Sequence, residues 1–369
     1  MERPLKDIVD GYDANLPLSA AQTLSSDWYI DPRIFELERR AVFSDWQVVG
    51  RLSQVAEPGQ FFTIELAGEP LLIVRGRDGV LRAFYNVCRH HAAAVVSESA
   101  GRLSALRCPY HGWTYALDGS LRSTPDFDGV CGFDRAQSGL VPVSVQAWES
   151  FVCVRLATSG ATLETTLGGL AAQVAGLALD KLQFAERRVY TVAANWKVYI
   201  DNYLDGSYHV PHIHKGLSSI IDYKNYLIEL GPRYCLQQSP LHSGSQDSAV
   251  AALRPGEQAA YYWLYPNFMI NWYEGVMDTN LVLPVAVDRT EVIFDMYFAD
   301  VSASAHEHNR ESIELADRIQ EEDATICASV QRGLRSRSYG AGRLSVRREA
   351  GEHLFHRLLH ADVKRALTE

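Results

Sequence analysis

The chain has 369 residues, of which 47% are hydrophobic and 22% are charged, and its formal net charge is −10. This length exceeds what one ordinary hydrophobic core organises, so it predicts two domains or one large enzyme subunit. The negative charge argues against nucleic acid or an anionic membrane surface as the main partner.

The N-terminal segment, residues 1–45, is predicted to be helical. Asp31 followed by Pro32 is typical of a helix start, with an N-cap and a proline in the first turn. The segment lacks the apolar core and the cleavage site of a signal peptide. No later stretch approaches the roughly 20 apolar residues needed to span a bilayer. We therefore expect a cytoplasmic protein with no membrane partner.

The next segment, about 46–157, changes to short apolar-rich runs separated by Gly, Pro and Asp. Such runs predict antiparallel strands joined by tight turns, and TYALDGSLR predicts a hairpin with an Asp-Gly turn. This segment is therefore expected to be an all-β domain.

The remainder, 158–369, begins with a predicted helical link over 161–182. The elements expected after it are a strand that becomes a helix after about Asn195, strands from about Tyr223 to Phe298, and helices at about 303–333 and 349–367. Strands followed by helices predict an α+β second domain.

Two cysteines and two histidines of the all-β segment have a distinctive spacing: Cys88-x-His90, then seventeen residues, then Cys108-x2-His111. A single tetrahedral zinc could take all four ligands, but zinc knuckles usually pair like with like. A mixed cysteine and histidine pair at each end instead indicates a Rieske [2Fe–2S] cluster, in which two cysteines hold one iron and two histidines hold the other.

The sequence around this spacing supports the same interpretation. CPYHGWTYALDG, which contains Cys108 and His111, resembles the second loop of Rieske domains almost letter for letter. His91 follows His90 directly, and because adjacent side chains do not both point at one cluster, His91 is expected at the surface or behind the ligands. The other cysteines are interpreted as small core residues: Cys131, Cys153, Cys235 and Cys327.

A second group of metal-ligand types lies in NWKVYIDNYLDGSYHVPHIH, residues 195–214. Its candidates are Asp201, Asp205, His209, His212 and His214. Two histidines and one carboxylate are the usual ligands of non-haem Fe(II), which keeps open positions for dioxygen.

Geometry alone leaves the choice of histidines open. On a continuous helix His209 and His212 share a face, because they are three residues apart. Pro211 is expected to break or distort the helix, and such a break could turn His214 toward the same metal.

The segment resembles the catalytic motif of Rieske non-haem iron oxygenase α subunits, which is an acid, then Y-H, four residues and H. This resemblance implies that His209 and His214 are the iron ligands and that Tyr208 is the motif tyrosine. It leaves His212 behind the ligands or in the wall of the pocket.

The third iron ligand of the family is an aspartate in a later helix. In QEEDATICASVQRGL the resemblance implies Asp323, with Glu321 and Glu322 as rival carboxylates.

An acid shortly before the first histidine joins the two metal centres of the family across a subunit boundary. The resemblance implies Asp205, which would hydrogen-bond His111 of one chain and His209 of the next. Many members place this acid three residues before the histidine, where this chain has Gly206. Asp201 is the alternative.

Further stretches are similar to choline monooxygenase and its bacterial relatives: DNYLDGSYHVPHIHKGL, YPNFMINWY, MDTNLVLP and VQRGLRSRSYGAGRLS. The resemblance covers about 28–360 and implies three parts. These are a helical segment (1–45) packed on the catalytic domain, a Rieske domain (46–157), and a helix-grip (START-like) catalytic domain with an antiparallel sheet (158–369). It also implies a homotrimer.

The implied activity is that of a Rieske monooxygenase or dioxygenase component. It would use O2 to hydroxylate or oxidatively N-demethylate a small substrate. Electrons would come from NAD(P)H through a separate flavin or ferredoxin-type reductase, because no G-x-G-x-x-G fingerprint opens a βαβ unit here. An electron carrier that uses only the cluster is a remote alternative.

The resemblance to choline monooxygenase implies a choline-like quaternary ammonium substrate, and a pocket for such a cation needs aromatic faces. The candidate wall is Tyr261, Tyr262, Trp263, Tyr265, Phe268, Trp272, Tyr273 and Glu274. Alternating aromatics in a strand also form plain core. This chain reads N-W-Y-E-G where choline-type sequences have N-R-Y-G, so a small aromatic or other uncharged substrate is the alternative.

Overall fold

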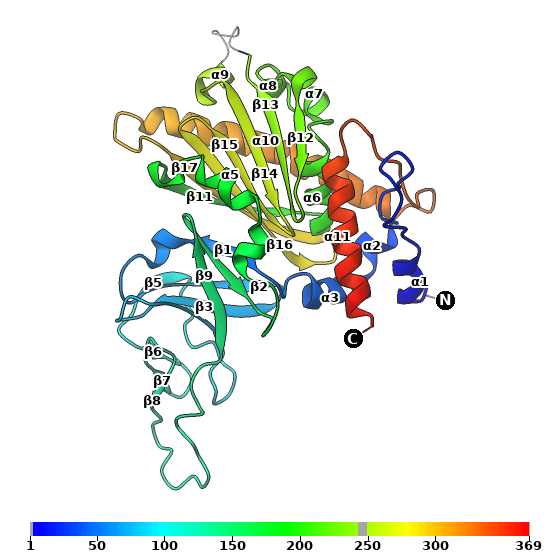
Figure 1. Cartoon of the computed structure of the whole chain (residues 1–369). Helices are drawn as coiled ribbons and strands as arrows, with labels where there is room; N and C mark the ends of the chain where they lie inside the picture. Colours follow the sequence, from blue (N-terminus) through cyan, green and yellow to red (C-terminus); the bar gives the residue numbers. More distant parts are fainter. Residues whose placement is uncertain (1–2, 243–248, 369) are drawn as a thin grey trace. The chain divides into compact units, whose positions relative to one another are not determined.

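The computed structural model describes residues 3–242 and 249–368. The chain forms two compact units (Figure 1). One unit is Phe43–Leu163, and the other joins Met1–Val42 to Glu164–Glu369. Residues 158–163, which the sequence placed with the catalytic segment, therefore belong to the first unit.

The regular elements of the unit Phe43–Leu163 are strands, apart from one 3-10 helix and the first residue of α4. Its larger sheet has the order β1-β10-β9-β4-β3-β2-β5, and a smaller sheet has the order β6-β7-β8. The elements are β1 (Gln47–Arg51), the 3-10 helix η1 (Leu52–Val55), β2 (Gln60–Leu66), β3 (Glu69–Arg75), β4 (Leu81–Tyr85), β5 (Ala100–Arg102), β6 (Leu106–Arg107), β7 (Thr114–Tyr115), β8 (Leu121–Ser123), β9 (Pro142–Trp148) and β10 (Phe151–Arg155).

The predicted Asp-Gly hairpin is confirmed as β7 and β8. Gly119 in its turn has φ +84°, and a Cβ there would lie 2.4 Å from the Phe84 ring. Only glycine satisfies both the positive φ and this close approach.

The second unit contains a seven-stranded antiparallel sheet with the order β11-β17-β16-β15-β14-β13-β12. Its strands are β11 (Gln183–Val192), β12 (Leu227–Leu230), β13 (Tyr234–Pro240), β14 (Gln258–Leu264), β15 (Phe268–Tyr273), β16 (Val276–Ala286) and β17 (Arg289–Phe298). Its helices are α1 (Leu5–Asp10), α2 (Asp27–Ile30), α3 (Pro32–Ala41), α4 (Leu163–Leu167), α5 (Leu170–Ala175), η2 (Leu179–Lys181), α6 (Trp196–Leu204), α7 (Val210–Ile213), α8 (Lys215–Ser218), η3 (Tyr223–Asn225), α9 (Ala249–Leu253), α10 (His306–Leu334) and α11 (Ala350–Ala366).

The α+β class is confirmed, with two corrections in the helices. The N-terminal segment is helical only over α1, α2 and α3, and residues 11–26 form turns and coil. The expected link helix is divided into α4, α5 and η2. Gly168 adopts φ +51° between α4 and α5, and Ala178 adopts φ +51° directly before η2. Within the described residues, no helix is both long and apolar enough to cross a membrane.

Helix α6 lies at the centre of this unit and carries the first half of the predicted iron motif. It contacts β16 and both long helices, α10 and α11. Asn195 caps its N-terminus by accepting a hydrogen bond from the Lys197 N–H. The Lys197 ammonium then pairs with Glu38 of α3 at 2.8 Å, and neither side chain is exposed. This buried pair fixes α6 to the N-terminal segment.

Candidate metal centres and substrate cavity

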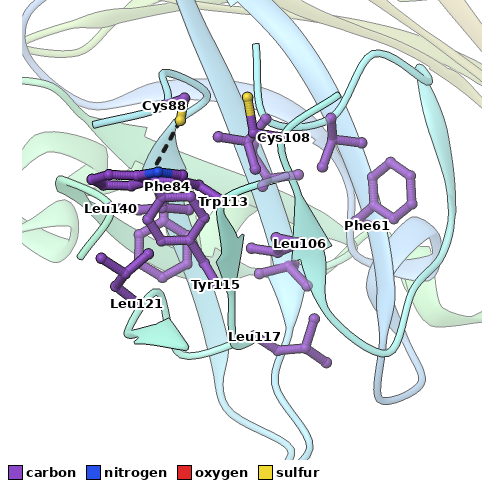
Figure 2. Close-up of a cluster of buried hydrophobic side chains, with 14 residues drawn as sticks. Phe61, Phe84, Cys88, Leu106, Cys108, Trp113, Tyr115, Leu117, Leu121 and Leu140 are labelled. Carbon is purple, nitrogen blue, oxygen red and sulfur yellow. Dashed lines mark hydrogen bonds between the residues drawn. The ribbon is translucent and has the colours of Figure 1, made fainter. Parts of the chain in front are cut away.

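Cys88 and Cys108 lie in the hydrophobic core of the first unit. Each follows a strand, β4 and β6 respectively, and both thiols are buried and free of disulfides. Figure 2 shows both sulfurs at the top edge of a cluster that includes Trp113 and Tyr115. The Tyr115 hydroxyl lies 3.4 Å from the Cys88 sulfur. Two buried thiols at one edge of a hydrophobic core are placed to bind a metal cluster rather than to contact solvent.

The two predicted histidine ligands come together at the same edge. The rings of His90 and His111 are 4.7 Å apart between centroids. The Nδ1 atom of His90 is buried and has no hydrogen-bond partner. A buried ring nitrogen without a partner costs free energy that a metal bond would repay. His91 is exposed, as expected. The four residues therefore fit a [2Fe–2S] cluster.

The remaining cysteines give one correction. Cys153, Cys235 and Cys327 are buried, but Cys131 is exposed in the connection between β8 and β9. Cys131 is therefore not a core residue.

The iron motif follows α6 through an irregular connection. The helix ends at Leu204, and Gly206 and Ser207 both have positive φ, +66° and +59°. A Cβ on Gly206 would lie 2.2 Å from the Arg348 carbonyl oxygen, so only glycine fits there. Pro211 does not break a helix, contrary to the expectation. It lies in the first turn of α7, where proline is well tolerated.

Helix α7 is only four residues long, and the two predicted iron ligands flank it. His209 occupies the N-cap position of α7, and His214 occupies its C-cap position. Their rings lie 4.9 Å apart and nearly perpendicular, at 82°. Two ring nitrogens can therefore approach one point from different directions.

Asp323 of α10 completes the group. Its Oδ1 lies 3.0 Å from His214 Nε2 and 3.7 Å from His209 Nε2. One ligand atom from each of the three residues falls within 4.8 Å of the others. Two imidazoles and one carboxylate converging in this way fit a mononuclear iron with open coordination positions.

Two further residues hold these ligands in place, and the sequence analysis did not identify either of them in this role. Glu322 accepts a hydrogen bond from His214 Nδ1 at 2.7 Å, and Asn202 donates one to Asp323 Oδ1 at 2.8 Å. Burial alone would lower the pKa of His214, but the neighbouring carboxylates raise it. This negative field is one that a metal cation would neutralise. Glu321 is exposed.

The two candidate acids of the motif, Asp205 and Asp201, have different hydrogen-bond partners. Asp205 lies 2.7 Å from His209 Nδ1 and also accepts hydrogen bonds from the backbone N–H groups of Tyr208 and His209. Asp201 accepts a hydrogen bond from the Tyr29 hydroxyl and contacts His356. Among the two, Asp205 is the one that orients an iron-ligand histidine.

His212 and Tyr208 are exposed, and neither lines the cavity beside the ligands. The expected place of His212 in the pocket wall is therefore wrong. His212 lies within the short helix α7, on its exposed side.

A cavity of about 120 Å³ lies beside His209, His214 and Asp323. Its aromatic walls are Tyr199, Tyr203, Tyr226, Tyr261, Tyr273 and Phe294. Of the aromatic wall expected from the sequence, only Tyr261 and Tyr273 line it. Glu274 is exposed, in the turn between β15 and β16.

A row of polar and aromatic side chains crosses the sheet at this cavity. Gln237, Tyr261, Asn271 and Asp278 are register partners on β13, β14, β15 and β16, and all four line the cavity. Asp278 is 6% exposed. Sequence reasoning missed this row, although MDTNLVLP contains Asp278.

Two family models match the chain. The model described as the Rieske [2Fe-2S] domain matches residues 45–135, and the model described as the ring hydroxylating alpha subunit (catalytic domain) matches residues 179–364. The first match contains all four predicted cluster ligands, and the second contains all three predicted iron ligands.

Similar proteins and structures agree with these matches. Chloroplastic choline monooxygenase of Arabidopsis thaliana is 40% identical over 97% of this chain and 86% of its own length. The carnitine monooxygenase oxygenase subunit of Escherichia coli (strain K12) is 33% identical over 92% of this chain and 93% of its own. A quaternary ammonium Rieske monooxygenase structure superimposes with a TM-score of 0.86, at 29% identity, and covers 98% of this chain and 99% of that chain.

Naphthalene 1,2-dioxygenase, with a TM-score of 0.76 at 19% identity, shares the fold. The matches assign a Rieske [2Fe–2S] cluster and a mononuclear iron to this chain. They make it an oxidoreductase that incorporates molecular oxygen, and its electrons come from a partner reductase. This protein belongs to the Rieske non-haem iron oxygenases, as an α subunit.

Proposed function

We propose that this chain is the oxygenase component of a quaternary ammonium monooxygenase. It would insert one oxygen atom into a C–H bond of a small trimethylammonium compound. The second oxygen atom leaves as water, so each turnover takes two electrons and two protons. If the carbon belongs to an N-methyl group, the hydroxylated product breaks down to a demethylated amine.

The cavity beside His209, His214 and Asp323 is the observation that carries this proposal. Six aromatic side chains line it, and a cation in such a site is attracted to the faces of the rings. The similar proteins are named choline monooxygenase and carnitine monooxygenase, and choline and carnitine are both trimethylammonium compounds.

The chain's own residues then have separate roles. Cys88, His90, Cys108 and His111 would hold the cluster, and His209, His214 and Asp323 would hold the iron. The iron, when bound, supplies the chemistry that activates dioxygen. Asp205 keeps the His209 ring in place through Nδ1, Glu322 does the same for His214, and Asn202 orients Asp323. The aromatic walls exclude water and place a substrate methyl group near the open positions.

The assembly is a proposal of its own. We expect a homotrimer in which Asp205 of one subunit also meets His111 of the next, because the similar quaternary ammonium Rieske monooxygenase structure was described in terms of inter-subunit electron transfer. The cytoplasmic location and the helical, Rieske and catalytic segments expected from the sequence stay predictions. The similar plant proteins are chloroplastic by name.

The uncharged-substrate alternative receives less support. The cavity contains the buried charges of Asp278 and Arg254, which an uncharged aromatic substrate would leave without a partner.

Metal analysis tests the two-site assignment. Purified protein should hold about three irons and two sulfides per chain, as one [2Fe–2S] cluster and one mononuclear iron require. His214→Ala should lose about one iron and keep the Rieske EPR signal after dithionite reduction. His212→Ala is the matched control, because His212 is exposed and away from the cavity, and it should lose none. Loss of iron from both variants, or from neither, would contradict the assignment.

A single-turnover experiment tests the substrate class without the reductase. Reduced protein, freed of dithionite, is mixed with O2 and one compound at a time: choline, L-carnitine, gamma-butyrobetaine or indole. An oxidised or demethylated product from a trimethylammonium compound, formed with O2 and not without it, is expected. Product from indole alone would replace the proposal with the uncharged alternative.

A further inference from the structure

We propose that this cavity selects a zwitterion, a trimethylammonium compound that also carries a carboxylate, with Asp278 pairing with the ammonium end and Arg254 with the carboxylate end. This inference rests on the proposed function and narrows it. Choline carries only the cation, whereas carnitine and gamma-butyrobetaine carry both charges.

Asp278 presents a free carboxylate oxygen to the cavity. Its Oδ2 accepts hydrogen bonds from the side-chain amides of Asn271, at 2.6 Å, and Asn280, at 3.2 Å. Its Oδ1 accepts none from the described residues. Burial raises the pKa of Asp278, while the charge of Arg254 and the two amides lower it. A buried carboxylate with one open oxygen is stabilised by an incoming cation.

The surroundings of Asp278 hold it in one orientation. Asn271 donates to Asp278 and accepts a hydrogen bond from the Tyr203 hydroxyl at 2.8 Å. Tyr261 lies next to Asn271 in the register, and its hydroxyl meets that of Tyr273 at 2.7 Å. Tyr203, Tyr261 and Tyr273 line the same cavity as Asp278, and aromatic rings are the surroundings that a desolvated ammonium favours.

Arg254 is the second buried charge of the same cavity, and it is 5% exposed. Its Nη1 donates to the Leu253 carbonyl, at 2.9 Å, and to the Ser312 hydroxyl, at 2.5 Å. Its guanidinium carbon lies 5.3 Å from the centre of the Tyr273 ring. Among the described residues, no carboxylate oxygen lies within 4.0 Å of its nitrogens. Within that part of the chain, Arg254 is a buried cation without an anionic partner.

The two charges line one cavity but do not pair with each other. If Arg254 served only to neutralise Asp278, a direct ion pair would be the favourable arrangement in so buried a place. Kept apart, they match a ligand with opposite charges at its two ends. A ligand with only a positive charge would satisfy Asp278 and leave Arg254 unpaired beside it.

Isothermal titration calorimetry on the iron-loaded protein tests this pairing through binding alone. The probes are choline, gamma-butyrobetaine and 3,3-dimethylbutan-1-ol, an uncharged compound with the shape of choline. Gamma-butyrobetaine should bind wild type at least tenfold more tightly than choline. Arg254→Gln should weaken gamma-butyrobetaine about 10–100-fold and leave choline unchanged or tighter, and Arg254→Lys should recover part of the loss.

Asp278→Asn should weaken both trimethylammonium ligands about 10–100-fold and leave 3,3-dimethylbutan-1-ol unchanged. Matched controls are Arg233→Gln and Asp295→Asn, which remove the same charges outside the cavity. Both should bind all probes as wild type does.

The outcomes separate this inference from the proposed function. Equal binding of choline and gamma-butyrobetaine, unchanged in Arg254→Gln, would overturn the zwitterion and keep the quaternary ammonium substrate. Binding of 3,3-dimethylbutan-1-ol or indole with no binding of either ammonium ligand would overturn both. If a variant loses its cluster or iron, the relative affinities of the wild-type protein for choline, gamma-butyrobetaine and 3,3-dimethylbutan-1-ol test the inference without it.

Discussion

The buried ion pair between Glu38 and Lys197 gives a sharp stability prediction. Both side chains have no exposed surface, and the ammonium lies 2.8 Å from the carboxylate. The Trp196 indole N–H also donates to Glu38 at 2.9 Å. Burial raises the pKa of Glu38 and lowers that of Lys197, while the attraction between the two groups opposes both shifts.

Glu38→Gln removes the negative charge and leaves the Lys197 ammonium buried without a counter-ion. Breaking one side of such a pair costs about 3–5 kcal/mol. For a unit of this size, about 2–4 °C of melting temperature are lost for each kcal/mol, so the expected drop is about 6–20 °C. Because Lys197 lies in the first turn of α6, the variant should also lose iron from the site that this helix supports.

Scanning calorimetry measures the drop, with the visible absorbance of the cluster as a separate probe of the Rieske unit. Replacing both charges, in Glu38→Leu/Lys197→Met, should recover most of the lost stability, since apolar groups of similar size tolerate this burial. Glu36→Gln is the matched control on the same helix, because its pair with Arg39 is partly exposed and contributes at most about 1 kcal/mol. A Glu38→Gln melting temperature within about 2 °C of wild type would refute the reasoning, since the pair would then be neutral or hydrated.

Three further predictions concern the iron site. Asp205→Asn should weaken iron binding about 10–100-fold, because it removes the charged acceptor at His209 Nδ1, and the cluster should stay in place with a Rieske-type EPR signal. Loss of the cluster signal would contradict this role. Asn202→Ala should weaken iron binding about tenfold in a chelator titration, through the freed Asp323 carboxylate. Gly206→Ala should lower the melting temperature more than Gly129→Ala, because both have positive φ but only Gly206 meets backbone at 2.2 Å.

The cluster ligands could be predicted from the sequence because they are local, whereas His209 and His214 were chosen over His212 only by resemblance to a family. Cys88 and His90 belong to one turn and Cys108 and His111 to another, so spacing alone indicated the chemistry. Asp323 was distant and came only from resemblance to a family, since Glu321 and Glu322 offer the same carboxylate. The orientation of α10 decides among the three, and orientation depends on packing rather than on local pattern.

The substrate cavity could not be predicted, for a different physical reason. Its polar row joins Gln237, Tyr261, Asn271 and Asp278, which are neighbours only through the pairing of four strands. Alternation along β14 and β15 says which residues share a face, but not which face meets the helices. Hence Tyr262 and Trp272 looked equivalent to Tyr261 and Tyr273 in the sequence.

The division of labour within the catalytic unit follows from the origin of its side chains. The iron ligands and their supports come from α6, α10 and the short helix α7, whereas Asp278 comes from the sheet and Arg254 from the residue after α9. A change at Asp278 or Arg254 therefore alters which charges the cavity accepts without moving a metal ligand. The similar enzymes are named for choline, a cation, and for carnitine, a zwitterion. We therefore expect substrate selectivity in such cavities to depend on buried charges like Asp278 and Arg254 rather than on the aromatic walls. An Arg254→Gln variant that still loads iron fully but exchanges its preference from gamma-butyrobetaine to choline would show the two functions to be separable.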